Sequence, residues 1–204
     1  MKFKFLLFGL FSCGFSAQAS LVSSYDLNGG YHDSLGVSPD LTHSNSSLPN
    51  GTLEFSNGSG VELINIIRNG AEYNIEVSFS YSGENSGYGA FMSFNELEDS
   101  LLYIRSNELL FYGKPKVYTS SKSFPVDTQM VFGLSRKKSG EFAYYINGEK
   151  LKSGYDESNA LLLTGQETRI SLFIDDGTEN LAGSLDYIRI YDNESDMVGD
   201  RNMS

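Results

Sequence analysis

The sequence lacks tryptophan and contains one cysteine and four prolines among its 204 residues. With Cys13 as the single thiol, no disulfide can form within the chain, and no cysteine–histidine spacing suits zinc. Basic residues are also few, 15 against 26 acidic ones, which gives a net charge of −11. Because phosphate contacts need clustered lysine and arginine, nucleic acid is not expected as a partner.

What the chain does contain predicts its fold class. Hydrophobic residues make up 40% of the sequence and charged residues 20%, so the chain is expected to fold, and its length fits one domain. It has 13 tyrosines and 14 phenylalanines. Aromatic and β-branched residues alternate with polar ones far more often than they recur at helical spacing. The expected fold is an all-β, two-sheet antiparallel sandwich of the jelly-roll type.

Short alternating runs separated by Gly, Asn and Ser give the expected strands. Residues 28–51 are polar and are expected to form a long rim loop with little regular structure. The dipeptide Asn57-Gly58 indicates a hairpin turn between the runs on either side of it, and Asn147-Gly148 indicates a type I′ turn. The ranges expected to form strands are 21–27, 53–55, 61–64, 73–81, 90–94, 101–105, 109–112, 117–119, 130–135, 142–146, 149–151, 169–174 and 184–191.

The N-terminus has the features of an export signal. Lys2 and Lys4 precede an apolar run over residues 5–11, and the triplet Ala17-Gln18-Ala19 provides a cleavage site. The run is too short to span about 30 Å of hydrocarbon, and no later segment is long enough to cross a membrane. Cleavage after Ala19 would give a secreted or periplasmic protein with a single domain over residues 20–204.

A second maturation route involves Cys13. This residue follows Leu10-Phe11-Ser12, a triplet similar to a bacterial lipobox, and cleavage before the cysteine would give a lipid-anchored protein. The Ala-x-Ala site favours the first route.

Three segments resemble the bacterial laminin-G-like, concanavalin A-like jelly-roll family. They are Tyr25-Asp26-Leu27-Asn28-Gly29 with Asp33-Ser34-Leu35-Gly36, then Tyr145-Ile146-Asn147-Gly148-Glu149-Lys150, and finally Gly183-Ser184-Leu185-Asp186-Tyr187-Ile188-Arg189-Ile190-Tyr191-Asp192. The resemblance spans nearly all of residues 20–204 and is most specific in the last segment. It implies the concanavalin A-like fold and a structural calcium ion held by Asp26, Asp33 and Asp186, since calcium takes carboxylate and loop oxygens.

Glycan binding is the function that the aromatic residues suggest, because sugars stack on aromatic faces. Tyr88, Tyr112 and Tyr118 lie near expected turns and are the candidates. Lys114, Lys116 and Lys122 form a local basic cluster that either meets an acidic polysaccharide or protects an edge strand with charge.

The sequence offers only weak candidates for catalytic residues. The acidic run at residues 96–99 lacks the alternation that a hydrolase strand needs, and His32 and His43 lie in the expected rim loop. The acids Asp175, Asp176 and Glu179 are typical of a solvated hairpin tip. We therefore expect an exported, non-catalytic module that binds glycan or a surface protein. A polysaccharide hydrolase or lyase on the same fold, or a structural or adhesive surface module, remains the alternative.

Overall fold

The computed structural model describes residues 20–64, 66–67, 70–82, 87–94, 101–113, 116–120, 122–163, 169–174, 179 and 181–192. Their regular structure is almost all β, with one short 3-10 helix at Pro49–Gly51. The strands are β1 (Leu21–Tyr25), β2 (Thr42–Ser47), β3 (Leu53–Ile64), β4 (Tyr73–Ser82), β5 (Gly89–Phe94), β6 (Leu101–Arg105), β7 (Glu108–Gly113), β8 (Lys116–Thr119), β9 (Met130–Arg136), β10 (Glu141–Ile146), β11 (Glu149–Tyr155), β12 (Arg169–Leu172) and β13 (Ala182–Tyr191).

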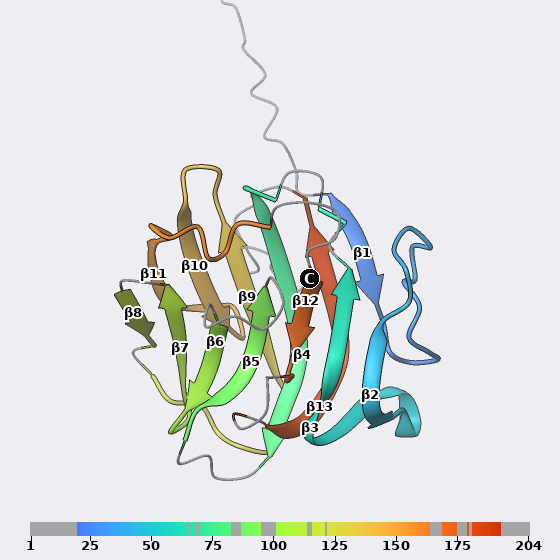
Figure 1. The fold of residues 1–204 in the computed structure, drawn as a ribbon. Helices are drawn as coiled ribbons and strands as arrows, with labels where there is room; N and C mark the ends of the chain where they lie inside the picture. The colour runs from blue at the N-terminus through green and yellow to red at the C-terminus, as the bar shows by residue number, and fades with distance from the viewer. Residues whose placement is uncertain are drawn as a thin grey trace, which may run out of the picture.

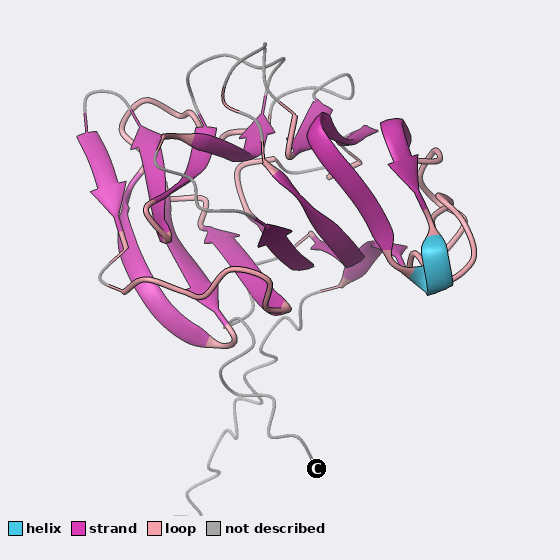
Figure 2. Ribbon diagram, turned by 90° about the horizontal axis from the view of Figure 1, so that it is seen from below, coloured by secondary structure: helices cyan, strands magenta, loops and turns pink. Residues whose placement is uncertain are grey.

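The strands form an antiparallel sandwich, which confirms the predicted fold class (Figure 1). Hydrogen-bonded neighbours follow the order β11-β10-β9-β4-β13-β3-β12-β5-β6-β7-β8, with β1 added to β13 and β2 added to β3. Strand β13 pairs with β4 along its length but with β3 only over Gly183–Leu185, so the sheet folds over at this point. One layer is formed around β4, β9 and β13 and the other around β3, β5 and β7, and Figure 2 shows the sandwich from below.

The core between the layers follows the alternation seen in the sequence. Ile75, Val77, Phe79 and Tyr81 of β4 all point inward and are buried, as predicted. Phe91 of β5 packs edge-on against the opposite layer, 4.9 Å between ring centres from Phe132 of β9. Burial of such rings is the main source of stability in a fold with no disulfide.

Two expectations for the first third of the chain are wrong. Residues 53–55 and 61–64 do not form a hairpin, because they belong to one strand, β3, that pairs with β13 at its first half and β12 at its second. Gly58 has a φ of 80°, and residues 56–59 of β3 lie opposite the single residue between Ser44 and Ser46 of β2, so they form a large irregular bulge and not a hairpin turn. The expected rim loop also contains a strand, β2, which pairs with β3.

The turn predicted at Asn147-Gly148 is confirmed. Asn147 and Gly148 have φ angles of 50° and 78°, as a type I′ turn requires, and they join β10 to β11. Residues 137–140 form the turn that joins β9 to β10, and Arg136, the last residue of β9, pairs with Phe142.

The two ends of the long strand order meet at a seam between β8 and β11. The described residues of β8 and β11 do not pair through their backbones, and side-chain contacts join the two strands instead. The hydroxyl of Tyr118 in β8 donates to the carbonyl oxygen of Tyr155 in β11 at 3.0 Å. Lys116 pairs with Glu157, and Lys122 pairs with Glu149. This seam of β8 and β11 uses two lysines of the basic cluster noted in the sequence.

Several sequence predictions fall outside the described residues. They concern the signal at residues 1–19 with Cys13, the acidic run at residues 96–99, and the side chains of Lys114, Asp175 and Asp176. Within the part of the chain that the structure describes, there is no helix whose length and apolar character would let it cross a membrane.

Candidate functional site

A cluster of tyrosines lies on the outer face of the layer formed by β5, β6 and β7. In β6, Leu102 and Ile104 point into the main core, so Tyr103 between them points to the opposite side. Tyr103 pairs directly with Leu110 of β7, and the two form a second hydrophobic cluster with Ala90 of β5. Tyr88 and Tyr112 pack against this cluster and are half-buried. Two of the three tyrosines predicted from the sequence are thus brought together.

The three rings form a compact triangle. Ring centres are 5.5 Å apart for Tyr88 and Tyr103, 5.7 Å for Tyr88 and Tyr112, and 5.4 Å for Tyr103 and Tyr112. Each pair is edge-to-face, with interplanar angles of 73° to 79°. This geometry is favourable for aromatic pairs and holds the rings in fixed orientations.

Arg105 completes this tyrosine cluster, which we define as Tyr88, Tyr103, Arg105 and Tyr112. Its guanidinium carbon lies 4.6 Å from the centre of the Tyr88 ring, a cation–π contact. Its Nη1 donates to the Tyr88 hydroxyl at 2.6 Å, and the Tyr112 hydroxyl donates to the same oxygen at 2.8 Å. The hydrogen bond to Tyr88 raises the pKa of Tyr112, because loss of the phenol proton would break it.

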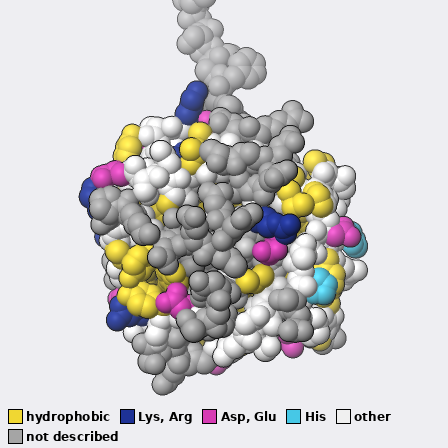
Figure 3. Space-filling view, viewed as in Figure 1, with side chains coloured by type: hydrophobic (Ala, Val, Ile, Leu, Met, Phe, Trp, Pro, Cys, Tyr) yellow, Lys and Arg dark blue, Asp and Glu magenta, His cyan; other side chains and the backbone are white. Residues whose placement is uncertain are grey.

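The arrangement can bind a ligand that has both apolar faces and hydroxyl groups. Arg105 is exposed, and its planar guanidinium carries five N–H donors, more than Tyr88 uses. Because the Tyr88 oxygen accepts two hydrogen bonds, its own proton is oriented by them and can be donated to a ligand. Val117 of β8, which pairs with Tyr112 and shares its face, is 49% exposed and extends the apolar surface. Figure 3 shows hydrophobic side chains gathered over β6 and β7, with charged groups beside them.

Tyr118, the third tyrosine predicted to bind glycan, lies elsewhere. Its ring faces the interior, 5.9 Å from that of Phe111 and 5.1 Å from that of Phe142. Its hydroxyl closes the seam to β11, as described above. The structure therefore separates Tyr118 from the tyrosine cluster, since Tyr118 pairs with Phe111 on the inner face and Val117 beside it points outward.

Asp33 supports the loop that follows β1. Its side chain is 5% exposed, and its oxygens accept hydrogen bonds from four backbone N–H groups. Burial by itself raises the pKa of Asp33, but these donors outweigh it and the net pKa is lowered. The donors belong to Ser24, Leu35, Val37 and Ser38.

The surroundings of Asp26 and Asp33 do not fit a shared calcium ion. Backbone donors occupy both oxygens of Asp33, whereas calcium requires free oxygens. Among the described residues, Asp26 faces the guanidinium of Arg189, 3.7 Å away. Asp186 lies at the irregular step of β13 between Leu185 and Tyr187. Among the described residues no group of three His, Cys, Asp or Glu side chains is placed to hold a metal ion.

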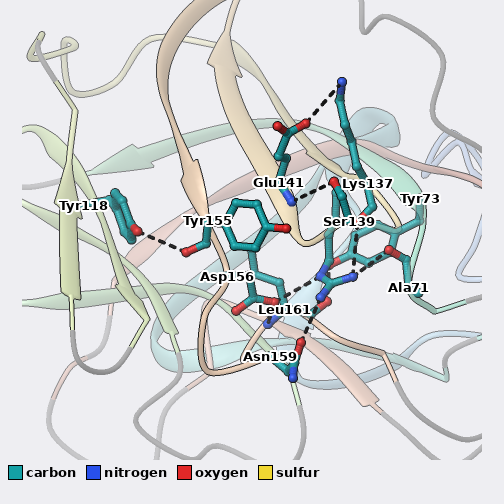
Figure 4. A network of polar contacts seen from close by, with 11 residues as sticks. Ala71, Tyr73, Tyr118, Lys137, Ser139, Glu141, Tyr155, Asp156, Asn159 and Leu161 are labelled. Atoms are coloured by element: carbon teal, nitrogen blue, oxygen red, sulfur yellow. Dashed lines mark hydrogen bonds and ion pairs between the residues drawn. The ribbon is translucent and has the colours of Figure 1, made fainter.

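A buried ion pair near the β9–β10 turn is structural (Figure 4). Nε of Arg136 donates to Oδ2 of Asp156 at 3.0 Å, and both side chains are buried. Nη1 of Arg136 donates to the carbonyl oxygen of Ala71, and Nη2 donates to Oδ1 of Asn159. The Leu161 N–H donates to Asp156 as well. The pair therefore fixes the chain after β11 against β9 and leaves no access for a ligand.

Tyr103 and Arg105 complete the tyrosine cluster, and sequence reasoning missed them. Ser106 and Asn107 have φ angles of 50° and 63°, so they form the two-residue turn of the β6–β7 hairpin. Reading this dipeptide as the turn would have placed Tyr103, Arg105 and Tyr112 on one face, because the side-chain period of a strand is two.

Comparison with known proteins supports the fold but identifies no family for this chain. No protein-family model matches the sequence, and a search of curated proteins gives no significant match. Among solved structures, domain 4 of AbnA, a GH43 extracellular arabinanase from Geobacillus stearothermophilus in complex with arabinotriose, is similar with a TM-score of 0.65. It is 18% identical, and the match covers 86% of this chain and 94% of that one.

Two other similar structures cover less of their own chains. Trypanosoma rangeli sialidase in complex with sialic acid has a TM-score of 0.66 and 12% identity, over 86% of this chain and 31% of that one. The binding domain of botulinum neurotoxin DC in complex with rat synaptotagmin II has a TM-score of 0.64 and 14% identity, over 87% of this chain and 49% of that one. Against these two, the present chain spans less than half of the matched protein. The similarities establish that the chain folds as a β-sandwich like these domains.

Proposed function

We propose that this protein is a non-catalytic glycan-binding module and that the tyrosine cluster is its binding site. The observation that carries the proposal is the placement of Tyr88, Tyr103 and Tyr112 on the outer face of the sheet, outside the main core. Tyr103 is buried within this second cluster, whereas Tyr88 and Tyr112 pack against it and keep exposed surface, unlike the fully interior Tyr73 and Tyr144. Rings with a fixed orientation beside a guanidinium match the alternating CH faces and hydroxyl groups of a sugar.

The similar structures support this proposal. The arabinanase domain was solved with arabinotriose, the sialidase with sialic acid, and the botulinum neurotoxin domain with a protein receptor. A further botulinum structure, of type C, concerns two ganglioside molecules. The arabinanase and botulinum neurotoxin domains support a binding role, whereas the sialidase is an enzyme and the match covers only 31% of it. The tyrosine cluster favours glycan over protein as the ligand because its exposed surface is small and rich in hydrogen-bond donors.

Membership of the laminin-G-like family and export both remain part of the proposal. The residues quoted from the first, middle and last segments are the support for the family. For export, β1 begins at Leu21, so cleavage after Ala19 would leave every described strand in place. We propose a secreted or periplasmic location, with lipid anchoring at Cys13 as the other route. Mass spectrometry of the exported protein distinguishes them.

A glycan array probed with the purified protein tests the function. We expect binding to a limited set of glycans, and Tyr112→Ala should abolish it because the ring offers both a face and a hydroxyl. Tyr155→Ala is the matched control, since this tyrosine is 49% exposed but lies on β11. Equal loss of binding in both variants, or no binding by the wild type, would refute the proposal.

Catalysis is tested on the same glycans. Incubation with each bound polysaccharide should release no new reducing ends and no unsaturated products. Reproducible turnover would instead assign a hydrolase or lyase activity to the fold.

A further inference from the structure

A hollow lies on the other layer of the sandwich, beside β1 and β13. It has a volume of about 380 Å³ and is lined by Leu21, Ser24, Asp26, Ser34, Leu35, Arg189 and Tyr191. Ile188 and Ile190 of β13 point into the core, so Arg189 between them points outward. The hollow and the tyrosine cluster therefore lie on opposite outer faces of the sandwich.

Arg189 is held at the hollow by three neighbours. Its guanidinium carbon lies 4.2 Å from the centre of the Tyr187 ring. Its Nη1 is 3.5 Å from Glu76 and its Nη2 is 3.7 Å from Asp26. Both distances exceed the 2.7–3.2 Å of a normal N–H···O hydrogen bond, so the two carboxylates neutralise the guanidinium without saturating its donors. Arg189 is fixed in place and still has hydrogen-bonding capacity.

Asp26 is held in a similar way. The hydroxyl of Ser34 lies 3.0 Å from its Oδ2 and shares its one proton between this oxygen and the carbonyl oxygen of Ser24, 2.6 Å away, and the hydroxyl of Ser24 approaches Oδ1 of Asp26 at 3.4 Å. The carboxylate is 45% exposed, so its oxygens can accept further hydrogen bonds. Donors on Arg189 and acceptors on Asp26 thus lie side by side at one opening.

The charges and walls of the hollow limit its ligand. Asp26 and Arg189 are the charged side chains that line the hollow, and their opposite charges balance, so the hollow favours neither an anion nor a cation. The side chains of Leu21 and Leu35 supply an apolar wall, and both are exposed. A group that donates and accepts hydrogen bonds at once, beside a CH face, fits all three features.

We propose that this hollow is a second binding site and that it takes a neutral saccharide through two neighbouring hydroxyl groups. One hydroxyl donates to Asp26 and the other accepts from Arg189, while the CH face of the sugar ring packs on Leu35. The site is independent of the tyrosine cluster, and either site can exist without the other. Asp26 acts here as a hydrogen-bond acceptor and needs no metal.

The test is a backbone-amide NMR titration of the whole protein with D-glucose, D-galactose, D-mannose and L-arabinose, each to high millimolar concentration. At least one sugar should shift amides of residues 21–26, 34–37 and 187–191. Asp26→Asn should weaken this binding about tenfold or more, the size of one charge-assisted hydrogen bond. Leu35→Ser should also weaken it, and because Leu35 is 45% exposed this change should leave the fold intact.

Two controls separate this proposal from the proposed function. Asp40→Asn removes an exposed acid from the same loop but not from the hollow, and it should leave the shifts unchanged. Tyr112→Ala should affect only shifts around residues 88–112. Shifts at residues 21–26 that persist unchanged in Asp26→Asn, no shifts there with any of the four sugars, or shifts there with methylammonium instead would overturn the proposal. Absence of binding at the tyrosine cluster would leave it standing.

Discussion

The hydroxyl of Tyr112 donates to the hydroxyl of Tyr88 at 2.8 Å, across 24 residues of sequence. Tyr88 immediately precedes β5 and Tyr112 lies in β7, yet both lie outside the main core beside Tyr103. Arg105 donates to the same Tyr88 oxygen, so this one phenol orients two neighbours.

Tyr88→Phe tests this arrangement. The ring and its contacts remain, but Arg105 and Tyr112 lose their common acceptor. We expect little change in stability, because the lost bonds lie at the surface, and a fall in glycan affinity of about tenfold, or roughly 1.4 kcal/mol. Isothermal titration calorimetry with a glycan from the array measures it. Unchanged affinity in Tyr88→Phe would mean that the hydroxyl does not position the ligand-binding groups.

Gly154→Ala tests the closure of the seam between β8 and β11. A Cβ at this position would lie 2.4 Å from Cε1 of Tyr118 and 3.0 Å from Cζ of Phe142. Because these rings are packed in the core, we expect a loss of about 1–3 kcal/mol and a lower melting temperature. Gly29→Ala is the matched control, since its Cβ would meet nothing within 4 Å. Equal melting temperatures for the two variants would contradict the seam as described.

Asp33→Asn should destabilise the fold in a pH-dependent way. An asparagine NH₂ would face backbone N–H donors, which we expect to cost about 1–3 kcal/mol at neutral pH. Because the folded-state pKa of Asp33 is lowered, its stabilising effect is present above the ordinary aspartate pKa of about 3.9. That effect is lost as the pH falls through the lower, folded-state pKa.

The measurement is urea unfolding of wild type and Asp33→Asn at a series of pH values. The difference between their free energies of unfolding should shrink as the pH falls below about 4. Asp40→Asn, from the same loop, should show no such trend. A constant difference would mean that Asp33 does not act through its charge.

Calcium provides a fourth prediction. Since the oxygens of Asp33 are occupied by backbone donors, a chelator and added calcium should both leave the melting temperature unchanged. An ion that joined Asp26 and Asp186 would instead stabilise the protein by about 2.7 kcal/mol at a hundredfold excess over its Kd. A rise of the melting temperature with calcium that Asp186→Asn removes would restore the calcium site that the family resemblance implies.

The buried ion pair of Arg136 and Asp156 provides the fifth prediction. Asp156→Ala would leave the guanidinium buried without its partner, and we expect a loss of about 3–5 kcal/mol in urea unfolding. The double variant Arg136→Met/Asp156→Leu should recover much of this loss, because it removes both charges. Glu141→Ala, which breaks the half-exposed contact with Lys137 at 3.6 Å, should cost about 0.5 kcal/mol or less. A double variant as unstable as Asp156→Ala would show that the charge itself is not the cause.

The sequence by itself determined the local features of this fold. The alternation at Ile75, Val77, Phe79 and Tyr81 predicted a strand with one buried face, and Asn147-Gly148 predicted a turn whose two positive φ angles the structure has. Such features depend on neighbouring residues alone, through the period of the strand and the sterics of the turn. For the same reason most expected strands are present within a residue or two of their predicted bounds.

Tertiary structure decided which strands pair and which side chains meet. Residues 53–64 form one strand because β12 and β13 offer edges to its two halves, and a local pattern carries no information about edges so distant in sequence. The family resemblance implied Asp33 only as a calcium ligand, and only the folded loop brings four backbone donors to it. Tyr112 and Tyr118 look alike in the sequence, but they point to opposite faces of one sheet. The register of the β7–β8 pair sets Tyr112 opposite Val117, which is exposed, and Tyr118 opposite Phe111, which is buried.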